Sequence, residues 1–330
     1  MQKVLVTGVT GYIGQHCAAE LLNKGYEVVG VIRSKAKAED TLNAIRKVAP
    51  VDNLSFAEAD LLSDKGWNEV LQGCAYVLHI ASPFLLAEPR DENDLITPAV
   101  EGTKRVISAA QKAGIKRLVL TSSTFAIIAG KDTGKYGPED WSDTNANIGA
   151  YAKSKTLAER AAWNAVKGGK MELVVINPGA VFGPSLGAKI DGQSVTMMTN
   201  MITGKIPMIP DMAMGMVDVR DIAKLEVAAL TAEGAAGQRF IAATAEPVEM
   251  ATLAKVLREA GYTKVPKLKA PNFLLKLMSL FDSEAKGMLP FLGKKVALDN
   301  STTVKVLNWK PTPMANSFKE MAAAISKKIN

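Results

Sequence analysis

A glycine-rich segment at residues 7–14 constrains the fold of this chain more than any other feature. It follows the apolar run 3–6, which has the β-branched character of a buried strand, and it leads into a helical pattern. In that pattern Ile13, Cys17 and Leu21 recur every fourth residue. This order of strand, glycine loop and helix predicts the first unit of a doubly wound α/β domain.

The same glycine loop predicts a dinucleotide site. Glycine lets the backbone turn tightly, approach a pyrophosphate closely and pack helix against strand, while the amides at the helix N-terminus face the phosphates. A tight turn without a ligand is the alternative. The residues that we expect to hold the cofactor here are Gly8, Thr10, Gly11, Tyr12, Ile13 and Gly14.

Strand and helix patterns alternate through the first half of the chain, with short connections. Their continuous apolar character is typical of parallel strands that are buried on both faces. The further strands that we expect are residues 28–32, 54–59, 76–80, 118–121 and 173–176. A helix is expected from Pro98, a residue that suits a first helical turn, to Gly114. We therefore predict a Rossmann-type, doubly wound parallel sheet.

The second half is less regular and predicts a smaller, mainly helical substrate lobe. We expect the dinucleotide-binding domain to comprise residues 1–177 and 212–245, and the substrate lobe to comprise residues 178–211 and 246–330. The apolar segment 273–278 is expected to form a core helix of this lobe, although a helix bound to a membrane or a partner has the same pattern.

Composition and charge argue against several classes of partner. Hydrophobic residues make up 48% of the chain and charged residues 22%, so a sizeable core is expected rather than disorder. The net charge of +7 comes from lysines and arginines scattered among acids, which is typical of a solvated surface and not of a nucleic-acid site. Two histidines and two cysteines argue against a metal site and a disulfide framework. We see no signal peptide and no run of about 18 apolar residues, so we expect a soluble cytoplasmic protein without membrane contact.

The end of the second expected strand indicates which dinucleotide binds. A carboxylate there would accept hydrogen bonds from the adenosine ribose, whereas this chain has Arg33, with Lys37 one turn on. A guanidinium pairs with a phosphate through two parallel hydrogen bonds, which favours NADP(H) over NAD(H); a surface ion pair is the alternative for Arg33. Asp60, at the end of the third strand, is expected to meet the adenine edge with Leu61 beside it, unless it only caps the helix that follows.

A serine, a tyrosine and a lysine form the candidate catalytic set. Tyr151 and Lys155 are four residues apart at the start of an expected helix and so share one helix face. A tyrosine with the ordinary pKa of about 10 seldom loses its proton near neutrality, but a neighbouring ammonium is expected to lower that pKa. Ser123 follows the fifth strand, at the edge where ligands bind such sheets, and can donate a hydrogen bond to a substrate oxygen that gains negative charge. An exposed helix pair is the alternative for the tyrosine–lysine spacing taken alone.

Together these motifs resemble the extended short-chain dehydrogenase/reductase superfamily. Within it the chain is similar to the dihydroflavonol reductase-like group, close to NADPH-dependent methylglyoxal and aldehyde reductases. The resemblance spans nearly the whole chain. It rests on residues 7–14, 31–34 with Lys37, 77–84, 121–123, 151–155, 161–163, 177–184, 217–221 and 298–300.

The resemblance implies roles for individual residues. It implies that Ser123, Tyr151 and Lys155 are catalytic, and that His79 is structural. Asp218, Arg220 and Asp221 would organise the junction with the lobe. The implied cofactor contacts are Ile80, Ala81, Ser82, Thr121, Tyr151, Lys155, Pro178 and Val181, and the implied substrate contacts are Phe84, Ser123 and Tyr151.

Two departures from the superfamily narrow the substrate class. Its sugar dehydratases carry an Asp-Glu pair after the threonine of the fifth strand, where this chain has Ser122 and Ser123. The segment between Ser123 and Tyr151 is also short compared with that of the plant flavonoid reductases. The first departure removes the carboxylates that dehydration needs, and the second argues against flavonoid substrates. Small aldehydes, ketones, diketones or keto esters fit better.

The sequence thus predicts an NADPH-dependent carbonyl reductase, monomeric or homodimeric. In this enzyme hydride would reach the carbonyl carbon while Tyr151 gives a proton to the oxygen. A nucleotide-sugar epimerase or dehydrogenase, or a hydroxysteroid dehydrogenase, is the enzymatic alternative on the same scaffold. An alternative of another class is a regulator that binds NADPH without turnover, although such proteins usually lack the tyrosine–lysine pair.

Overall fold

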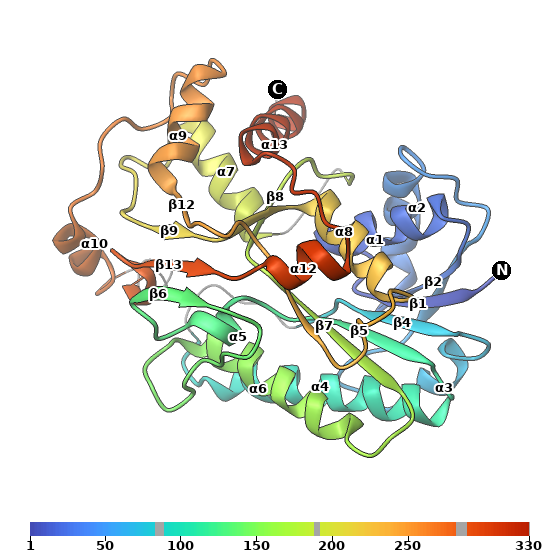
Figure 1. Ribbon diagram of the computed structural model, residues 1–330. Helices are drawn as coiled ribbons and strands as arrows, with labels where there is room; N and C mark the ends of the chain where they lie inside the picture. The colour runs from blue at the N-terminus through green and yellow to red at the C-terminus, as the bar shows by residue number, and fades with distance from the viewer. Residues whose placement is uncertain (83–88, 188–191, 282–288, 330) are drawn as a thin grey trace.

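A seven-stranded parallel sheet forms the centre of the computed structural model, which describes residues 1–82, 89–187, 192–281 and 289–329 (Figure 1). Its strands are β1 (Lys3–Thr7), β2 (Glu27–Ile32), β3 (Leu54–Glu58), β4 (Tyr76–His79), β5 (Arg117–Thr121), β7 (Glu172–Pro178) and β11 (Arg239–Ala242). They lie in the order β11-β7-β5-β4-β1-β2-β3. The chain steps outward from β1 to β3 and then starts β4 on the other side of β1. The strand order therefore reverses between β1 and β4, and ligands bind such sheets at the carboxyl edge beside this reversal.

Helices cover both faces of the sheet, because its strands are apolar on both sides. Along β1, Val4 and Val6 point into one core and Leu5 into the other. The first core lies under α1 (Tyr12–Asn23) and α8 (Val219–Ala229). The second lies under α4 (Asn93–Lys112) and α6 (Ala150–Val166), which pack along each other below the sheet in Figure 1. Burial of the strands from both sides fixes their carboxyl ends relative to one another.

A third core lies beyond the carboxyl edge of the large sheet. It packs Phe182 and Met216 against α7 (Gln193–Thr203), α9 (Met250–Glu259) and α13 (Met314–Ile329). Three two-stranded sheets accompany it: β8 (Ala180–Phe182) with β10 (Met216–Asp218), β9 (Ala213–Met214) with β12 (Val248–Glu249), and β6 (Thr133–Tyr136) with β13 (Lys295–Leu298). The remaining elements are η1 (Lys35–Lys37), α2 (Ala38–Ile45), α3 (Trp67–Val70), α5 (Phe125–Ile128), α10 (Asn272–Met278), η2 (Leu289–Phe291) and α12 (Ser301–Val306).

The expected doubly wound sheet is confirmed, but the expected start of α4 is wrong. This helix begins at Asn93, so Pro98 lies in its second turn and not in its first. Proline removes one backbone hydrogen bond in that place, the one that would reach the carbonyl of Asp94. The rest of the helix is long enough, and buried well enough against α6, to tolerate that loss.

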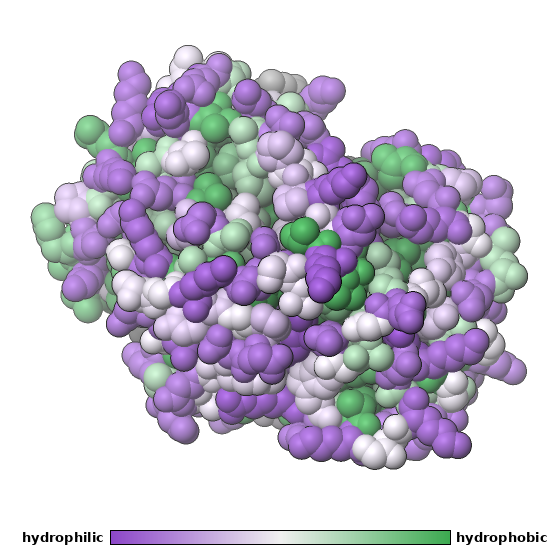
Figure 2. Space-filling view, in the orientation of Figure 1, coloured by the Kyte–Doolittle hydropathy of each residue, from purple (hydrophilic) through white to green (hydrophobic). Residues whose placement is uncertain are grey.

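The expectation that segment 273–278 is a core helix is also wrong. It does form α10, but no residue of α10 is buried, and Phe273 is 72% exposed. Apolar side chains gather on the surface at the left edge of Figure 2, where Figure 1 places α10. The segment is almost wholly apolar, so it lacks the polar face that tells which side of a helix is buried. The third core is built instead from α7, α9 and α13.

None of the helices within the described ranges is long and apolar enough to cross a membrane.

Candidate active site

The glycine loop connects β1 to α1 and leaves the N-terminus of α1 open. Gly8 has φ +70°, and a Cβ there would lie 2.9 Å from the backbone nitrogen of Ala81. A Cβ on Gly14 would lie 2.1 Å from the carbonyl oxygen of Gly8, so helix and loop fit together only with glycine at that position. Gly11 is the N-cap and is exposed. Its lack of a side chain leaves the first amides of α1 free to face an anion.

Thr7 joins the carboxyl ends of β1 and β4. Its Oγ1 lies 2.8 Å from Nδ1 of His79 and accepts hydrogen bonds from the backbone amides of Ile80 and Ala81, each at 3.1 Å. His79 is buried, and burial together with the charge of Lys155 lowers its pKa to about 3. A histidine that stays neutral and bonded to Thr7 holds the two strand ends together, which fits the structural role expected of it.

Arg33 and Lys37 lie at the outer end of β2, where a cation was expected. Both side chains are exposed, and neither forms an ion pair with any residue in the described ranges. The surface ion pair that was the alternative for Arg33 is therefore not seen. A guanidinium and an ammonium one turn apart give this edge of the loop a positive charge.

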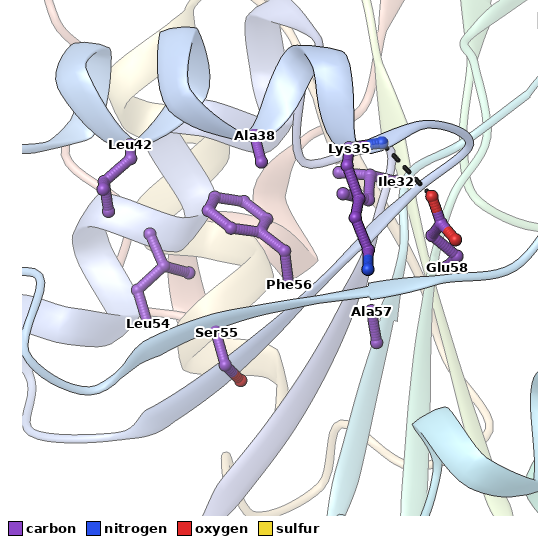
Figure 3. A pocket seen from close by; sticks show the side chains of 9 residues that line it. All are labelled: Ile32, Lys35, Ala38, Leu42, Leu54, Ser55, Phe56, Ala57 and Glu58. Carbon is purple, nitrogen blue, oxygen red and sulfur yellow. Dashed lines mark hydrogen bonds between the residues drawn. The ribbon is translucent and has the colours of Figure 1, made fainter.

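A groove of about 600 Å³ opens beside the segment that connects β2 to α2, between α2 and the edge strand β3 (Figure 3). Leu42, Leu54 and Phe56 form its apolar wall, and the backbone N–H of Lys35 donates to Oε1 of Glu58 at 3.2 Å across its rim. None of the residues expected to bind the cofactor lines this groove. The groove thus flanks the candidate cofactor edge and is separate from it.

Asp60 and Leu61 follow β3 on the same edge of the sheet. Oδ1 of Asp60 accepts from the backbone N–H of Leu62 at 2.9 Å. This bond gives Asp60 a role in forming the local turn, whether or not it also contacts an adenine ring. The side chain of Leu61 approaches Gly102 of α4 closely, and its carbonyl accepts from Arg105. Leu61 is thereby fixed against the helix layer, and both residues remain partly exposed.

Ser123, Tyr151 and Lys155 come together where β5 ends and α6 begins. Ser123 is buried, is hydrogen-bonded to the Tyr151 hydroxyl, and its backbone carbonyl accepts from Nδ2 of Asn177 at 3.1 Å. Thr124 donates its backbone N–H to the carbonyl of Pro178 at 2.9 Å, so β7 holds the serine turn in place. The three side chains are thus carried by two elements of fixed relative position.

The pKa values of this set differ from the expectation in one respect. Burial raises the pKa of Tyr151 to about 12, against the opposing effect of its hydrogen bond to Ser123. The expected lowering is therefore wrong for the protein described here, because loss of solvation outweighs the other influences on the phenol. Burial also lowers the pKa of Lys155 to about 8, although Glu159 and Glu226 oppose that change. A phenol that keeps its proton at neutral pH suits a proton donor.

A buried ion pair behind Lys155 was not found from the sequence. Glu159 lies one turn after Lys155 on α6 and has a wholly buried side chain. Its Oε1 accepts from Nε of Arg239 at 2.6 Å, and its Oε2 accepts from Oγ of Ser122 at 2.5 Å and from Nδ2 of Asn177 at 2.9 Å. The spacing of Tyr151, Lys155 and Glu159, four residues apart in turn, is the signal that would have placed Glu159 on the catalytic face.

A second buried carboxyl, Glu226 of α8, was also missed. It is wholly buried, and its Oε1 accepts a hydrogen bond of 2.5 Å from Oγ1 of Thr121. The sequence signal is a lone acid inside the apolar stretch 225–230. Thr121, which was expected to contact the cofactor, donates its hydroxyl hydrogen bond to Glu226.

A row of aromatic rings extends from Tyr151. Phe125 meets Tyr151 edge to face, with ring centroids 6.0 Å apart, and stacks on Phe291 at 4.5 Å. Pro178 ends β7 and Val181 lies in β8, while Ser82 follows β4 and is partly exposed. Phe84, expected at the substrate pocket, lies outside the described residues.

The residues expected at the lobe junction bond to the C-terminal segment of the chain. Oδ1 and Oδ2 of Asp218 accept from Arg220, and Oδ2 also accepts from Oγ of Ser317 on α13 at 2.6 Å. Asp221 accepts from Nε1 of Trp309 and from Thr312. These bonds connect the start of α8 to the C-terminal segment, which agrees with a structural role.

A glycine loop at the order reversal of a parallel sheet, with a serine, a tyrosine and a lysine at its carboxyl edge, defines a Rossmann-type dinucleotide-binding protein. The family model described as the NAD dependent epimerase/dehydratase family matches residues 4–243. The chain belongs to this family, and the resemblance to the extended short-chain dehydrogenases/reductases is confirmed.

Individual relatives agree with this membership. Cinnamoyl-CoA reductase CAD2 of Medicago truncatula is 31% identical over 278 residues, which cover 82% of each chain. Dihydroflavonol 4-reductase of Hordeum vulgare is 34% identical over 209 residues, which cover 61% of this chain and 59% of that protein. Among solved structures, yeast methylglyoxal/isovaleraldehyde reductase Gre2 complexed with NADPH aligns with a TM-score of 0.81 and 26% identity, over 99% of this chain and 98% of that one. The similarity to the dihydroflavonol reductase-like group is confirmed as well.

Proposed function

We propose that this protein is an NADPH-dependent reductase of small carbonyl compounds, with Tyr151 as the proton donor. The broader assignment is an oxidoreductase that uses NADP(H), in keeping with its family and with a structural neighbour solved with NADPH. The observation that carries the proposal is the hydrogen bond between Ser123 and Tyr151 at the carboxyl edge of the sheet, with Lys155 buried one turn along the same helix.

The glycine loop supports the fit of a dinucleotide. Side chains at Gly8 and Gly14 would collide with backbone, and Gly11 leaves the amides at the start of α1 exposed to a pyrophosphate. We assign the adenosine phosphate to Arg33 and Lys37, and the adenine edge to Asp60 and Leu61. Bound NADPH would supply the hydride.

The residues of this chain would supply the proton and the polar contacts. Tyr151, with its pKa raised to about 12, enters the reaction protonated and gives that proton to the carbonyl oxygen as negative charge develops there. Ser123 donates a hydrogen bond to the same oxygen, and the Lys155 ammonium stabilises the phenolate that remains. We also propose that Phe125 and Phe291 line the substrate side and favour compact, partly apolar carbonyls.

The domain division expected from the sequence stays a proposal. Residues 1–177 and 212–245 would bind the dinucleotide, and residues 178–211 and 246–330 would form the substrate lobe. The separate core around Phe182 and Met216, and the bonds of Asp218 to α13, support a lobe that is attached rigidly at the carboxyl edge.

A panel of carbonyl compounds tests the proposed activity. We expect NADPH oxidation with methylglyoxal, isovaleraldehyde, a diketone and a keto ester. The kcat/KM for these compounds should be at least about tenfold higher than for cinnamoyl-CoA, because a pocket shaped for a small carbonyl discriminates against a larger substrate by a few kcal/mol. UDP-glucose, assayed for epimerisation, serves as the comparison for the sugar-nucleotide alternative. Tight NADPH binding without turnover of any carbonyl would contradict the proposal and favour the regulator.

Replacement of Arg33 by glutamate is expected to reverse the cofactor preference. The substitution removes a charged hydrogen bond to the phosphate and adds a repulsive carboxylate, so KM for NADPH should rise about tenfold to a hundredfold while KM for NADH falls. Steady-state assays with both cofactors measure the ratio. Arg46→Glu is the matched control, because Arg46 is exposed on the far end of α2 and the charge change is the same. An unchanged NADPH/NADH ratio in R33E would show that Arg33 does not contact the phosphate.

A further inference from the structure

Asn177, near the end of β7, has a wholly buried side chain that the proposed catalytic step does not use. Its Nδ2 donates to the carbonyl oxygen of Ser123 at 3.1 Å and to Oε2 of Glu159 at 2.9 Å. Both partners are acceptors, so the amide nitrogen, and not the amide oxygen, must face them. Oδ1 has no hydrogen-bond partner among the described residues, so the two bonds of Nδ2 fix the amide.

The carboxylate that orients Asn177 is itself held in place. Oε1 of Glu159 accepts from Nε of Arg239 at 2.6 Å, and Oε2 also accepts from Oγ of Ser122 at 2.5 Å. The bonds close a ring, in which Glu159 and Asn177 link the side chain of Ser122 to the carbonyl of the next residue. Bonds to a buried charge are stronger than bonds between neutral groups, so this ring should be rigid.

The ring acts on the middle residue of a turn that is attached to β7. The N–H groups of Ser122 and Thr124 donate to carbonyls of β7 at 2.7 and 2.9 Å, and the side chain of Asn177 supplies the bond at Ser123 between them. The carbonyl of Ser123 also accepts from the N–H of Ala126 at 3.0 Å, but Ala126 belongs to the same segment and moves with it. Asn177 therefore ties the Ser123 carbonyl to the sheet.

The hydroxyl of Ser123 depends on this attachment. Its Oγ accepts from the backbone N–H of Phe125 at 3.1 Å and is hydrogen-bonded to the Tyr151 hydroxyl. Because the hydroxyl and the carbonyl are carried by the same Cα, a rotation of the main chain at Ser123 would move Oγ away from Tyr151.

Stability alone does not explain an asparagine at this position. Burying an amide oxygen without a partner is unfavourable, and Oδ1 of Asn177 is such an atom within the described part of the chain. A leucine has nearly the same shape and would bury no polar atom, as in the apolar residues 173–176 of the same strand. What asparagine adds is the pair of directed bonds at Nδ2.

We propose that Asn177 is a positioning residue for Ser123: its amide, oriented by the Glu159 carboxylate, holds the Ser123 carbonyl so that the hydroxyl of the same residue stays directed at the reacting oxygen. The catalytic consequence rests on the proposed reductase function, in which Ser123 donates a hydrogen bond to that oxygen. A small displacement of such a donor lowers the rate of the chemical step more than it weakens binding. The effect of Asn177 should therefore appear in kcat, and only while residue 123 carries a hydroxyl.

Replacement of Asn177 by leucine tests this role, because it removes both bonds of the amide and keeps a branched side chain of similar size. We expect kcat to fall about tenfold to fiftyfold with a good carbonyl substrate, while Kd for NADPH changes by less than about threefold. The Ser123 carbonyl keeps its bond from Ala126. Oε2 of Glu159 keeps its bond from Ser122, so neither acceptor is left without a partner.

A double-mutant cycle with Ser123→Ala separates positioning from a general structural effect. With no hydroxyl to position, N177L should lower kcat of S123A by less than about threefold. An equal loss in both backgrounds, or wild-type kcat in N177L, would overturn the proposal. Thr303→Val is the matched control, since the buried Thr303 hydroxyl donates to the carbonyl of Ile241 in β11 at 2.8 Å, and T303V should keep kcat within about threefold of the wild type.

Amide hydrogen exchange, measured by NMR on the protein without substrate, gives a second readout that does not depend on activity. The N–H of Phe125, which donates to Oγ of Ser123, should exchange at least about tenfold faster in N177L than in the wild type, and at the wild-type rate in T303V. An unchanged rate in N177L would refute the proposal even if the kinetics agree. A wild-type protein that reduces no carbonyl would overturn the proposed function instead, and the exchange rate would still decide whether Asn177 holds Ser123.

A milder variant keeps the test decisive if N177L fails to fold. Ser122→Ala opens the ring on its other side by removing the bond to Oε2 of Glu159, with little change of shape. We expect S122A to lower kcat about threefold and to speed exchange at Phe125. No change in either quantity would count against the proposal.

Discussion

Replacement of Tyr151 by phenylalanine is expected to lower kcat about a thousandfold with a good carbonyl substrate, since positioned proton transfer contributes roughly 10²–10⁴ in rate. The substitution removes the hydroxyl that bonds to Ser123 and leaves the ring, which still packs edge to face on Phe125. NADPH binding, measured by fluorescence titration, should change little by comparison. The loss should therefore appear in kcat and kcat/KM together.

A matched control exists in Tyr136. Its hydroxyl also donates one hydrogen bond, to the carbonyl of Thr133 at 3.0 Å. Tyr136 lies in the two-stranded sheet of β6 and β13, and it is not one of the three candidate catalytic residues. Tyr136→Phe should keep kcat within about threefold of the wild type, as substitutions outside a site usually do. Near-wild-type turnover in Y151F would remove the proton-donor role and with it the proposed mechanism.

Replacement of Arg239 by methionine is expected to lower the free energy of unfolding by about 3–5 kcal/mol, the usual effect of removing one partner of a buried ion pair. Glu159 would be left buried beside Ser122 and Asn177 without its cation. The bonds of Arg239 to the carbonyls of Pro138 and Asp140, and its stacking on Trp141 at 3.9 Å, would be lost at the same time. Urea denaturation followed by circular dichroism measures the change.

Two comparisons make this stability test specific. Lys104→Met breaks a surface pair with Glu101 whose side chains are about half exposed, and such pairs contribute about 0.3–0.5 kcal/mol. The double variant R239M/E159Q removes both charges, so it should be more stable than R239M alone. If R239M lowers the free energy of unfolding by no more than K104M does, the buried ion pair of Arg239 and Glu159 does not stabilise the fold as we expect.

Local sequence patterns were sufficient for the sheet and for the ends of its strands. The apolar runs gave β1 to β5 and β7, and the loop glycines explain why the backbone passes so close to Ala81. Because the residues that follow parallel strands lie at the carboxyl edge of the sheet, the places of Arg33, Asp60 and Ser123 in the fold were also predictable. Each of these inferences depends on neighbours that are close in the sequence.

What the sequence did not reveal depends on contacts between distant segments. Glu159 and Arg239 are 80 residues apart, and Thr121 and Glu226 are 105 apart, so no spacing rule joins them. The pairing of β6 with β13 brings together two short strands whose patterns are too brief to identify alone. The direction of the Tyr151 pKa shift was not predicted for a related reason. The sequence shows the lysine four residues away, whereas the burial that raises the pKa depends on the whole fold.

The position of β11 has a consequence for synthesis of the chain. This strand completes the large sheet by pairing with β7, yet it follows β7 only after α7, β8 to β10 and α8 have been made. While a nascent chain lacks β11, the hydrogen-bonding groups along one side of β7 stay open, and an open, apolar strand edge is a template for aggregation. A chain that ends before β11 would therefore leave this edge open, and we expect it to aggregate more readily than the 330-residue chain.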